Sequence, residues 1–348
     1  MTISIHDRVE DLAAEWERLA DAQGAPPWLR PGWFTIYGRA FGVRAWRIHA
    51  VRRDGRLAGV IPLVPGRFGL ASPSNWHTPE FGPLVEPDAR AELARSVFDT
   101  RSSSVGLSFV DRSDGEVGAW EATAASSGYR VLARALERSP YVDLAGGWEA
   151  YEATLGRKLK SELRRRRRRL ADQGEVVFEF CEGGEQLGAL LDEGFRVEAS
   201  GWKGERGSSI ASQASTSAFY RELAGWAATR GWLRIALLRV GGRAIAFDFA
   251  LEDARVHALL KTGFDPGFGR WAPGMLLRYE MLSRAFASGV ERYDFLGADE
   301  PWKLEWARAT RERSLVQAFA PSVAGRAGWT AFARGRPLAK RVVQAVRR

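Results

Sequence analysis

The spacing of apolar residues predicts short strands and amphipathic helices that occur twice, in the same order, along the 348-residue chain. The first half is expected to contain strand Ile3 to His6, helices Val9 to Leu19 and Pro31 to Phe41, hairpin strands Trp46 to Arg52 and Leu57 to Val64, strand Leu70 to Asn75, helix Ala89 to Phe98, and strands Val105 to Val110 and Tyr129 to Leu132. The second half is expected to contain strand Val176 to Cys181, helices Glu185 to Glu198 and Ser217 to Arg230, a hairpin from Leu233 to Leu251, strand Arg255 to Thr262, helix Pro273 to Ser288 and strand Arg292 to Leu296. This order predicts an α/β (mixed α+β) protein built from two units, each with a mostly antiparallel mixed sheet flanked by helices.

The two halves also share residues at a fixed distance in the chain. Five identities lie at an offset of 187 residues, relating Arg47, Ile48, Arg52, Gly55 and Arg56 to Arg234, Ile235, Arg239, Gly242 and Arg243. The first helices match at the shorter offset of 175, so the second half has about a dozen extra residues near Gly201 to Ser212. A loop present in one copy only is a natural place for binding groups, because loops on a rigid scaffold tend to hold them.

We expect a first domain at residues 1–145, a second at 146–320 and a basic C-terminal helix at 321–348. A helix at 151–173 opens the second domain, with a leucine stripe on one side and the arginine run Arg164 to Arg169 around the rest. Two interpretations of the run stay open: an anion clamp that includes Arg165 and Arg168, and a solvated helix that joins the domains. The C-terminal helix is either a basic amphipathic anchor or a helix docked on the protein.

Composition narrows the classes of protein. Hydrophobic residues make up 45% of the chain, with 14 Trp and 18 Phe, but no run of about 18 apolar residues occurs and the N-terminus does not resemble a signal peptide. Cys181 is the only cysteine, so we expect a cytoplasmic protein with no internal disulfide and no metal. The net charge of +9 and pI of about 10 favour polyanions, phosphorylated ligands or peripheral contact with an anionic membrane at the inner surface.

Three segments of the second half carry a resemblance to a known superfamily. They are Glu198 to Gly204, Lys261 to Leu277, and Tyr293 to Trp306. With the element order, they resemble the GNAT acyltransferases, and the tandem arrangement is similar to the FemAB-like and CelD-like branch. The resemblance implies two tandem GNAT-like domains, an accessory first domain and a catalytic second one, with the working site at the cleft between the halves.

The resemblance also implies how a donor would bind. GNAT enzymes hold the donor pyrophosphate in a turn of the form Arg/Gln-x-x-Gly-x-Gly/Ala, but Phe268 to Gly274 has a different glycine spacing and Pro273 lacks an N–H. A helix that begins Pro273-Gly274-Met275 still presents a positive end to an anion, and Arg270 precedes it. We therefore expect these residues to bind the donor, with acyl-CoA or another acyl thioester as co-substrate and no tightly bound cofactor. The alternative is that Pro273 is simply a good first-turn residue.

Candidate catalytic residues are chosen because amine acylation needs a base, a positioned amine and donors for an oxyanion. Glu198 is either the general base or an exposed helical glutamate, and Asp265 and Asp294 either orient the amine or cap turns. Lysine is rare in this chain, so the lysines retained in the family-like segments suggest compact ammonium donors, although each can be a surface charge. Lys261 is therefore a candidate catalytic residue. Lys203 and Lys303, together with the neighbouring Trp202 and Trp302, are candidate binding residues.

Two histidines are expected outside this set. His257 alternates with Leu259 along a strand and is expected to be a core histidine, whereas His77 is expected to mark a vestigial or accessory pocket in the first half.

The function predicted first is N-acyl transfer from acyl-CoA or an acyl-carrier protein to an amine on a sugar, peptide or small metabolite, in polysaccharide or envelope biosynthesis. A FemAB-like aminoacyl transfer from tRNA is the alternative, favoured by the arginine run and the high pI. A non-catalytic module that binds an anionic polysaccharide is the third class.

Overall fold

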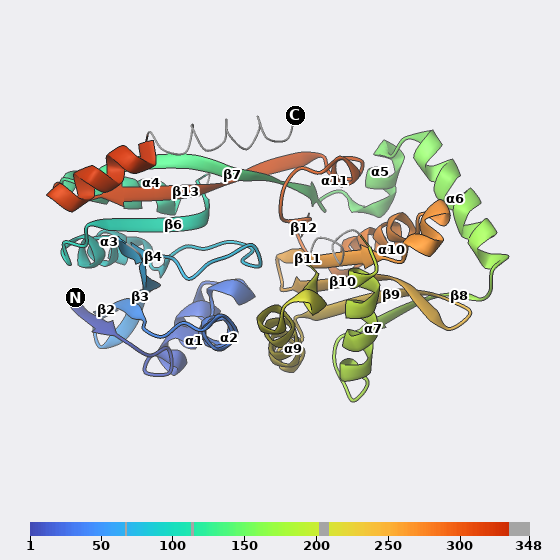
Figure 1. The fold of residues 1–348 in the computed structure, drawn as a ribbon, viewed down its shortest axis with the longest axis horizontal. Helices are drawn as coiled ribbons and strands as arrows, with labels where there is room; N and C mark the ends of the chain where they lie inside the picture. The colour runs from blue at the N-terminus through green and yellow to red at the C-terminus, as the bar shows by residue number, and fades with distance from the viewer. Residues whose placement is uncertain (67, 113–114, 202–208, 334–348) are drawn as a thin grey trace. The chain divides into compact units, whose positions relative to one another are not determined.

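The computed structural model describes residues 1–66, 68–112, 115–201 and 209–333 (Figure 1). Within this part of the chain, the elements up to residue 143 are β1 Thr2–His6, α1 Ala13–Ala22, η1 Pro27–Leu29, α2 Pro31–Phe41, β2 Arg47–Arg53, β3 Arg56–Gly66, β4 Gly69–Ala71, β5 Leu84–Val85, η2 Pro87–Ala89, α3 Arg90–Phe98, β6 Ser104–Asp111, α4 Gly115–Ser126 and β7 Arg130–Asp143. The elements that follow are α5 Gly147–Thr154, α6 Arg157–Ala171, β8 Val176–Cys181, α7 Leu187–Ala199, η3 Ile210–Ser212, α9 Ala214–Thr229, β9 Leu233–Val240, β10 Arg243–Glu252, β11 Val256–Phe264, η4 Pro266–Trp271, α10 Pro273–Ser288, β12 Arg292–Asp294, α11 Pro301–Leu304 and β13 Ala309–Phe319. The mixed α/β class expected from the sequence is confirmed.

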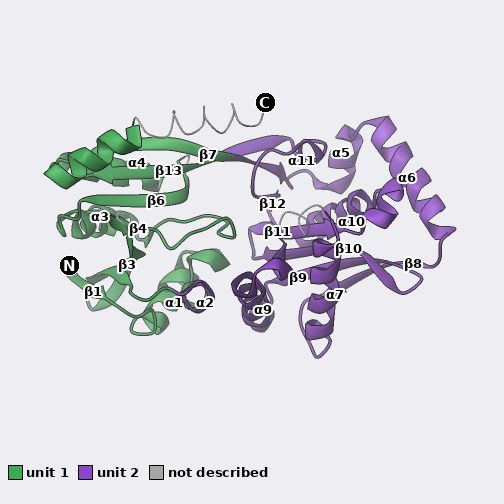
Figure 2. Cartoon of the chain, in the orientation of Figure 1, with its two compact units in different colours: residues 1–35, 43–137, 312–348 green, residues 36–42, 138–311 purple. Residues whose placement is uncertain are grey.

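The chain forms two compact units, shown in different colours in Figure 2. Unit 1 comprises residues 1–35, 43–137 and 312–348, and unit 2 comprises residues 36–42 and 138–311. Neither unit is a single stretch of sequence, whereas the domains expected from the sequence, 1–145 and 146–320 with a helix at 321–348, are each continuous. The strands explain the difference, because Arg313–Phe319 of β13 pair with β6 in unit 1 and Tyr141–Asp143 of β7 pair with β12 in unit 2.

The two units have the same strand order and directions. Unit 1 has the order β1-β2-β3-β4-β6 and unit 2 has β8-β9-β10-β11-β12, with antiparallel pairs except for the parallel last pair of each. Two non-glycine residues with positive φ, Phe109 at 62° and Leu296 at 49°, also lie 187 residues apart. The duplication predicted from the sequence is therefore confirmed.

Adjacent residues of β10 show which helices cover each face of the unit 2 sheet. Phe247 packs against Gly194 of α7, whereas the next residue, Asp248, pairs with Arg278 of α10. Because neighbouring strand residues point to opposite faces, α7 and α10 cover opposite faces. Phe249 contacts Tyr220 of α9, which places α9 on the α7 face.

The predicted helix at 151–173 is two helices, α5 and α6. Leu155 and Gly156 separate them in extended conformation, with Leu155 buried in the core of unit 2. The leucine stripe is nevertheless confirmed in α6, where Leu163 and Leu170 are buried and the arginines between them are largely exposed.

Residues 323–333 of the predicted C-terminal helix are helical and pack on unit 1. Arg130 lies 5.2 Å from the ring of Trp329, and Arg134 lies 4.2 Å from the ring of Phe332. The described part of this helix is thus docked on β7, and residues 334–348 lie outside the described part.

A buried histidine makes the stability of unit 1 depend on pH. His49 in β2 is fully buried, with Nδ1 3.1 Å from the Ser96 Oγ, and burial lowers the pKa of its imidazole from 6.5 to about 4. The unfolded chain binds a proton in this pH interval that the folded chain does not, so stability falls as the pH is lowered from 6.5 towards 4.

We expect the free energy of unfolding of unit 1 to fall by roughly 2 kcal/mol between pH 7 and pH 5 because of His49 alone. Urea unfolding at both pH values should show a smaller loss for His49→Gln than for the natural protein, with His6→Gln as the control. Equal losses in the natural protein and His49→Gln would contradict the assignment.

Candidate active site

A carboxylate, a phenol and an ammonium group come together on the α7 and α9 face of unit 2. Glu198 near the end of α7 has only 1% of its surface exposed, and Tyr220 of α9 is fully buried. The Lys261 Nζ lies 5.5 Å from the centre of the Tyr220 ring. The backbone of β11 also approaches α7 closely, since a β-carbon on Gly263 would lie 2.6 Å from the Glu198 Cα.

The charge states in this cluster follow from burial. Burial raises the pKa of Tyr220 well above its ordinary value, and the negative charge of Glu198 raises it further. The phenol therefore stays protonated at neutral pH and can only act as a hydrogen-bond donor or acceptor, not as a base. The Glu198 Oε2 accepts a hydrogen bond from the Ile210 N at 2.9 Å, so η3 fixes one oxygen of the carboxylate.

A β-bulge places Lys261 in this cluster. Phe249 of β10 pairs with Lys261, but the next residue, Ala250, pairs with Leu259, so Leu260 is an extra residue in β11. Regular alternation from His257, which lies under α10, would direct Lys261 to the α10 face. The extra residue reverses this, and Lys261 lies against α9 while Thr262 reaches Arg278 of α10.

The strands beside Lys261 separate at this point. Val256–Ala258 of β11 pair in parallel with Arg292–Asp294 of β12, and β11 then continues to Phe264 beyond the last of these pairs. The loop after β12 is held by buried polar groups: Asp294 accepts hydrogen bonds from the Leu296 N and the Arg311 Nε, each at 2.8 Å. The Lys303 Nζ donates to the Leu296 O at 2.8 Å and the Ala298 O at 3.0 Å. Asp294 and Lys303 therefore shape the loop that follows β12.

The remaining carboxylate and tryptophan candidates make contacts within turns. Asp265 accepts a hydrogen bond from the Gly267 N at 2.9 Å, caps η4 and forms an ion pair with Arg243. The Trp302 Nε1 donates to the Glu300 Oε2 at 3.3 Å, and the Trp302 ring packs on Phe295. The contacts of Asp265 are those of a turn-capping residue.

The start of α10 presents few free backbone donors. Ala272 is left-handed with φ of 49°, Pro273 has no N–H, and the N–H groups of Met275 and Leu276 both donate to the Ala272 O. The Arg270 guanidinium lies 3.8 Å from the Trp271 ring centre. Side-chain cations rather than backbone amides are therefore the main groups for an anion at this end of α10.

The arginine helix α6 supplies such cations nearby. Leu163 and Leu170 share a core cluster with Trp271 and Leu276, and α6 contacts both η4 and α10. Arg165 and Arg168 are exposed, and the Arg165 Nη2 donates to the Glu162 Oε2 at 2.6 Å. A set of exposed guanidinium groups is thus carried on a helix that packs beside the start of α10.

A buried ion pair that the sequence analysis missed joins α10 to the sheet. The Arg278 Nη2 donates to the Asp248 Oδ1 at 2.8 Å, and Nη1 donates to the Tyr293 hydroxyl. All three side chains are at most 1% exposed. Asp248 within the apolar run of β10 is the signal that could have revealed it, because a buried charge needs a partner.

Three other sequence candidates lie elsewhere. Trp202 and Lys203 fall outside the described residues. His257 is buried as expected, with its Nδ1 2.7 Å from the Glu252 Oε2. His77 lies in a turn of unit 1, where its N–H donates to the Asn75 Oδ1 at 2.9 Å.

The residues that the structure describes include no helix long and apolar enough to cross a bilayer. They also contain no cluster of three or more His, Cys, Asp or Glu side chains arranged to hold a metal ion.

We expect Gly263→Ala to disturb the Glu198 cluster because its β-carbon would overlap the backbone of α7. The strain should lower the free energy of unfolding by about 1 to 3 kcal/mol. Gly225→Ala in α9, where a β-carbon has open space, is the matched control and should not destabilise. Urea unfolding of both variants measures the difference, and equal stabilities would mean that α7 and β11 can separate without cost.

Comparison with known proteins gives a family match for part of the chain. Residues 157–304 match the family model of the acetyltransferase (GNAT) domain. A comparison with curated protein sequences gave no match.

Solved structures cover nearly the whole chain at low sequence identity. FemX is 13% identical, with a TM-score of 0.60 over 95% of this chain and 99% of its own. The C-terminal domain of a protein assigned as a lysylphosphatidylglycerol synthetase in Agrobacterium fabrum is 14% identical, with a TM-score of 0.56 over 92% of this chain and 96% of its own. L-PGS from Bacillus licheniformis is 15% identical, with a TM-score of 0.56 over 89% and 93%. Residues 157–304 therefore match the GNAT domain, and the chain as a whole shares the fold seen in FemX.

Proposed function

We propose that the protein transfers an acyl group to an amine and that unit 2 is the catalytic unit. The observation that carries the proposal is the convergence of Glu198, Tyr220 and Lys261 beside the separating strands β11 and β12 of the GNAT domain. A buried carboxylate, a protonated phenol and an ammonium group are the types of group that amine acylation requires.

Each group has a distinct part in the reaction. The amine nitrogen attacks the donor carbonyl, and Glu198 accepts the proton that the amine loses. The C–S bond then breaks, and the leaving thiolate takes up that proton to become the thiol. Lys261 and the Tyr220 hydroxyl stabilise the oxyanion of the tetrahedral intermediate, where positive charge and fixed donors are most effective. Asp265, Asp294, Trp302 and Lys303 position the loops around the reacting groups through the contacts described above.

The donor is proposed to be an acyl thioester, either acyl-CoA or an acyl-carrier protein. The start of α10 has few free backbone donors, so the phosphate groups of the acyl donor would be bound by side chains. These are Arg270 and the exposed arginines of α6, including Arg165 and Arg168. The acceptor would be an amine on a sugar, peptide or small metabolite, consistent with a role in polysaccharide or envelope biosynthesis.

Aminoacyl transfer from tRNA is the second candidate. The six-arginine segment of α6 favours it, because such a cationic surface binds a nucleic-acid backbone without sequence specificity. The fold shared with the domain assigned to a lysylphosphatidylglycerol synthetase, a protein named for a lipid that carries lysine, points the same way. If neither an acyl thioester nor an aminoacyl-tRNA is consumed, the remaining hypothesis is a non-catalytic module that binds a polysaccharide.

Unit 1 is proposed to be accessory. At the turn equivalent to Asp265–Gly269, the buried Arg313 of β13 donates to the Pro79 O and the Thr78 O and pairs with Glu137. A side chain from within the unit thus fills the place that corresponds to the donor turn of unit 2.

We expect Glu198→Gln and Lys261→Ala each to lower kcat/KM by about 10²-fold or more, the usual scale for a positioned base or oxyanion donor. Thiol release from acetyl-CoA and longer acyl-CoAs, with an amine panel, is the assay. His77→Ala in unit 1 and Lys158→Ala on the exposed side of α6 are controls that should keep turnover. The reverse pattern, with His77→Ala inactive and the unit 2 variants active, would place the chemistry in unit 1.

Replacing Arg165, Arg168 and Arg169 by Gln should weaken donor binding and reduce its salt dependence, because these side chains lie away from the buried leucines. Binding of acyl-CoA and of bulk tRNA, each titrated at several salt concentrations, distinguishes the two donors. The matched control replaces three exposed arginines elsewhere, Arg8, Arg44 and Arg326. Unchanged affinity and an unchanged salt dependence in the α6 variant would mean that these arginines are solvated side chains that do not bind the donor.

A further inference from the structure

Unit 2 has a second polar site under the C-terminal end of α10. A pocket of about 290 Å³ opens there between α10 and the ends of β8, β9, β10 and β11. Its polar lining includes Arg234, Glu252, His257 and Arg284, and its apolar lining includes Ile235 and Met281. The volume lies near the lower limit of small-molecule sites, roughly 300 Å³, which suits a small metabolite rather than a nucleotide.

This pocket is separate from the Glu198 cluster. His257 lies at the start of β11 on the α10 face, whereas Lys261 lies past the bulge on the α9 face. The pocket therefore has no part in the acyl transfer proposed above, and the inference drawn from it does not depend on that function.

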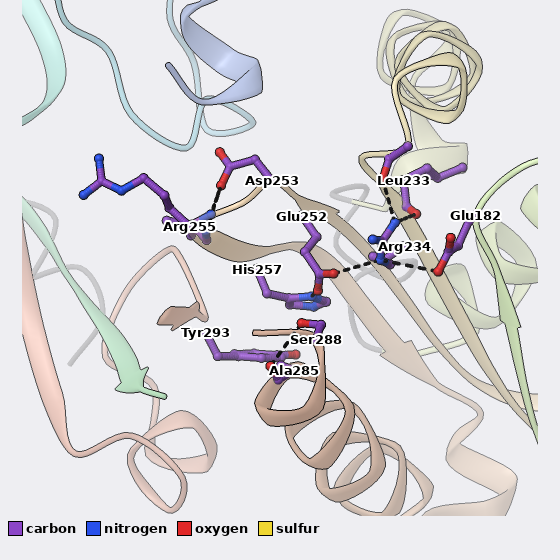
Figure 3. A network of polar contacts seen from close by, with 12 residues as sticks. Glu182, Leu233, Arg234, Glu252, Asp253, Arg255, His257, Ala285, Ser288 and Tyr293 are labelled. Carbon is purple, nitrogen blue, oxygen red and sulfur yellow. Dashed lines mark hydrogen bonds and ion pairs between the residues drawn. The ribbon is translucent and has the colours of Figure 1, made fainter. Parts of the chain in front are cut away.

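Arg234 is fixed in place before any ligand arrives (Figure 3). Its Nε donates to the Glu252 Oε1 at 3.0 Å, and its Nη1 donates to the Gly231 O and the Leu233 O at 2.9 Å and 2.8 Å. No hydrogen bond from its Nη2 occurs within the described part of the chain. A guanidinium held on two sides keeps one edge for an additional acceptor.

Arg284 supplies a second oriented guanidinium. Its central carbon lies 3.4 Å from the centre of the Phe180 ring, which is stacking distance. A stacked guanidinium keeps its N–H groups in the plane of the fork, where they bind carboxylate or phosphate oxygens. The Arg284 side chain is 53% exposed, so it can meet an incoming ligand.

Glu252, the buried one of the two acidic residues that line the pocket, is already neutralised. Glu252 is hydrogen bonded to His257 at 2.7 Å as well as to Arg234. Burial by itself would raise the pKa of Glu252, but the bond to His257 and the charge of Arg234 bring the pKa below its ordinary value, so the carboxylate stays ionised and holds Arg234.

His257 is stacked on Tyr293, with ring centres 4.5 Å apart, as Figure 3 shows. It is 1% exposed, and its Nε2 has no hydrogen-bond partner among the described residues. A buried, unpartnered ring nitrogen beside a pocket is what a site built for a polar ligand leaves open.

We propose that this pocket binds a small molecule with a carboxylate or phosphate group. Arg234 and Arg284 bind its oxygens, and its short apolar part contacts Ile235 and Met281. Glu182 competes for the same cation: it is 67% exposed and lies 3.7 Å from the Arg234 Nε.

The test is titration calorimetry on the full chain at low salt with butyrate, succinate, inorganic phosphate and butylammonium. Saturable binding of at least one of the three anions without binding of butylammonium is expected, and the anion that binds distinguishes carboxylate from phosphate. Arg284→Gln should weaken that binding about tenfold or more, the scale for a hydrogen bond to a charged group. Arg255→Gln is the matched control, because Arg255 is 65% exposed, pairs with Glu291 and does not line the pocket.

Glu182→Gln separates a binding role from a structural one. Removing this carboxylate frees Arg234 and should tighten anion binding about twofold to fivefold, whereas loss of a merely structural contact would not tighten it. Absence of saturable binding by all three anions, equal binding of butylammonium, or unchanged affinity in Arg284→Gln would each overturn the proposal.

Discussion

One extra residue in β11 sets the arrangement of polar groups in unit 2. Leu260 interrupts the pairing with β10, and the side chains beyond it face the opposite way from those before it. His257 therefore lies with Glu252 under α10, and Lys261 lies with Tyr220 under α9. Without the bulge, Lys261 would point to the α10 face, where Asp248 and Arg278 already form a buried pair, and Glu198 on the other face would have no ammonium group beside it.

The buried pair of Asp248 and Arg278 has a related effect. Two charges removed from water gain little net stability as a pair, but loss of either partner costs about 3 to 5 kcal/mol because the other is left buried and unpaired. The pair thus specifies how α10 is seated on β10. Since Arg278 also bonds to Tyr293 of β12, the helix, the central hairpin and the separating strand are joined through one side chain. The Glu198 cluster on the far face thus rests on strands that Arg278 links to one another and to α10.

Periodicity and the internal repeat were sufficient to predict most of the elements and the duplicated order, because strand and helix spacing follow directly from which residues are buried. They could not predict β13 or the length of β7, whose arginines and glutamates are partly buried in ion pairs and give no clean alternation. For the same reason the continuous domains expected at 1–145 and 146–320 differ from the compact units. In the site, Glu198 and Lys261 were selected by their motifs. Tyr220 and Arg278 were missed, because one residue in a regular apolar helix looks like any other until its neighbours are known.

Unit 1 is built from segments that lie far apart in the sequence, and this affects the order in which the two units fold during synthesis. Its strand β6 obtains a neighbour from Arg313–Phe319, about two hundred residues later in the chain. While the ribosome is still synthesising unit 2, β6 therefore has an unfilled edge, and exposed edges of this kind invite pairing with other chains. Unit 2 faces no such delay, since Tyr141–Asp143, which pair with β12, are synthesised before it. The later unit in the sequence can thus complete its sheet first, and synthesis of β13 is the event that completes the sheet of the earlier one.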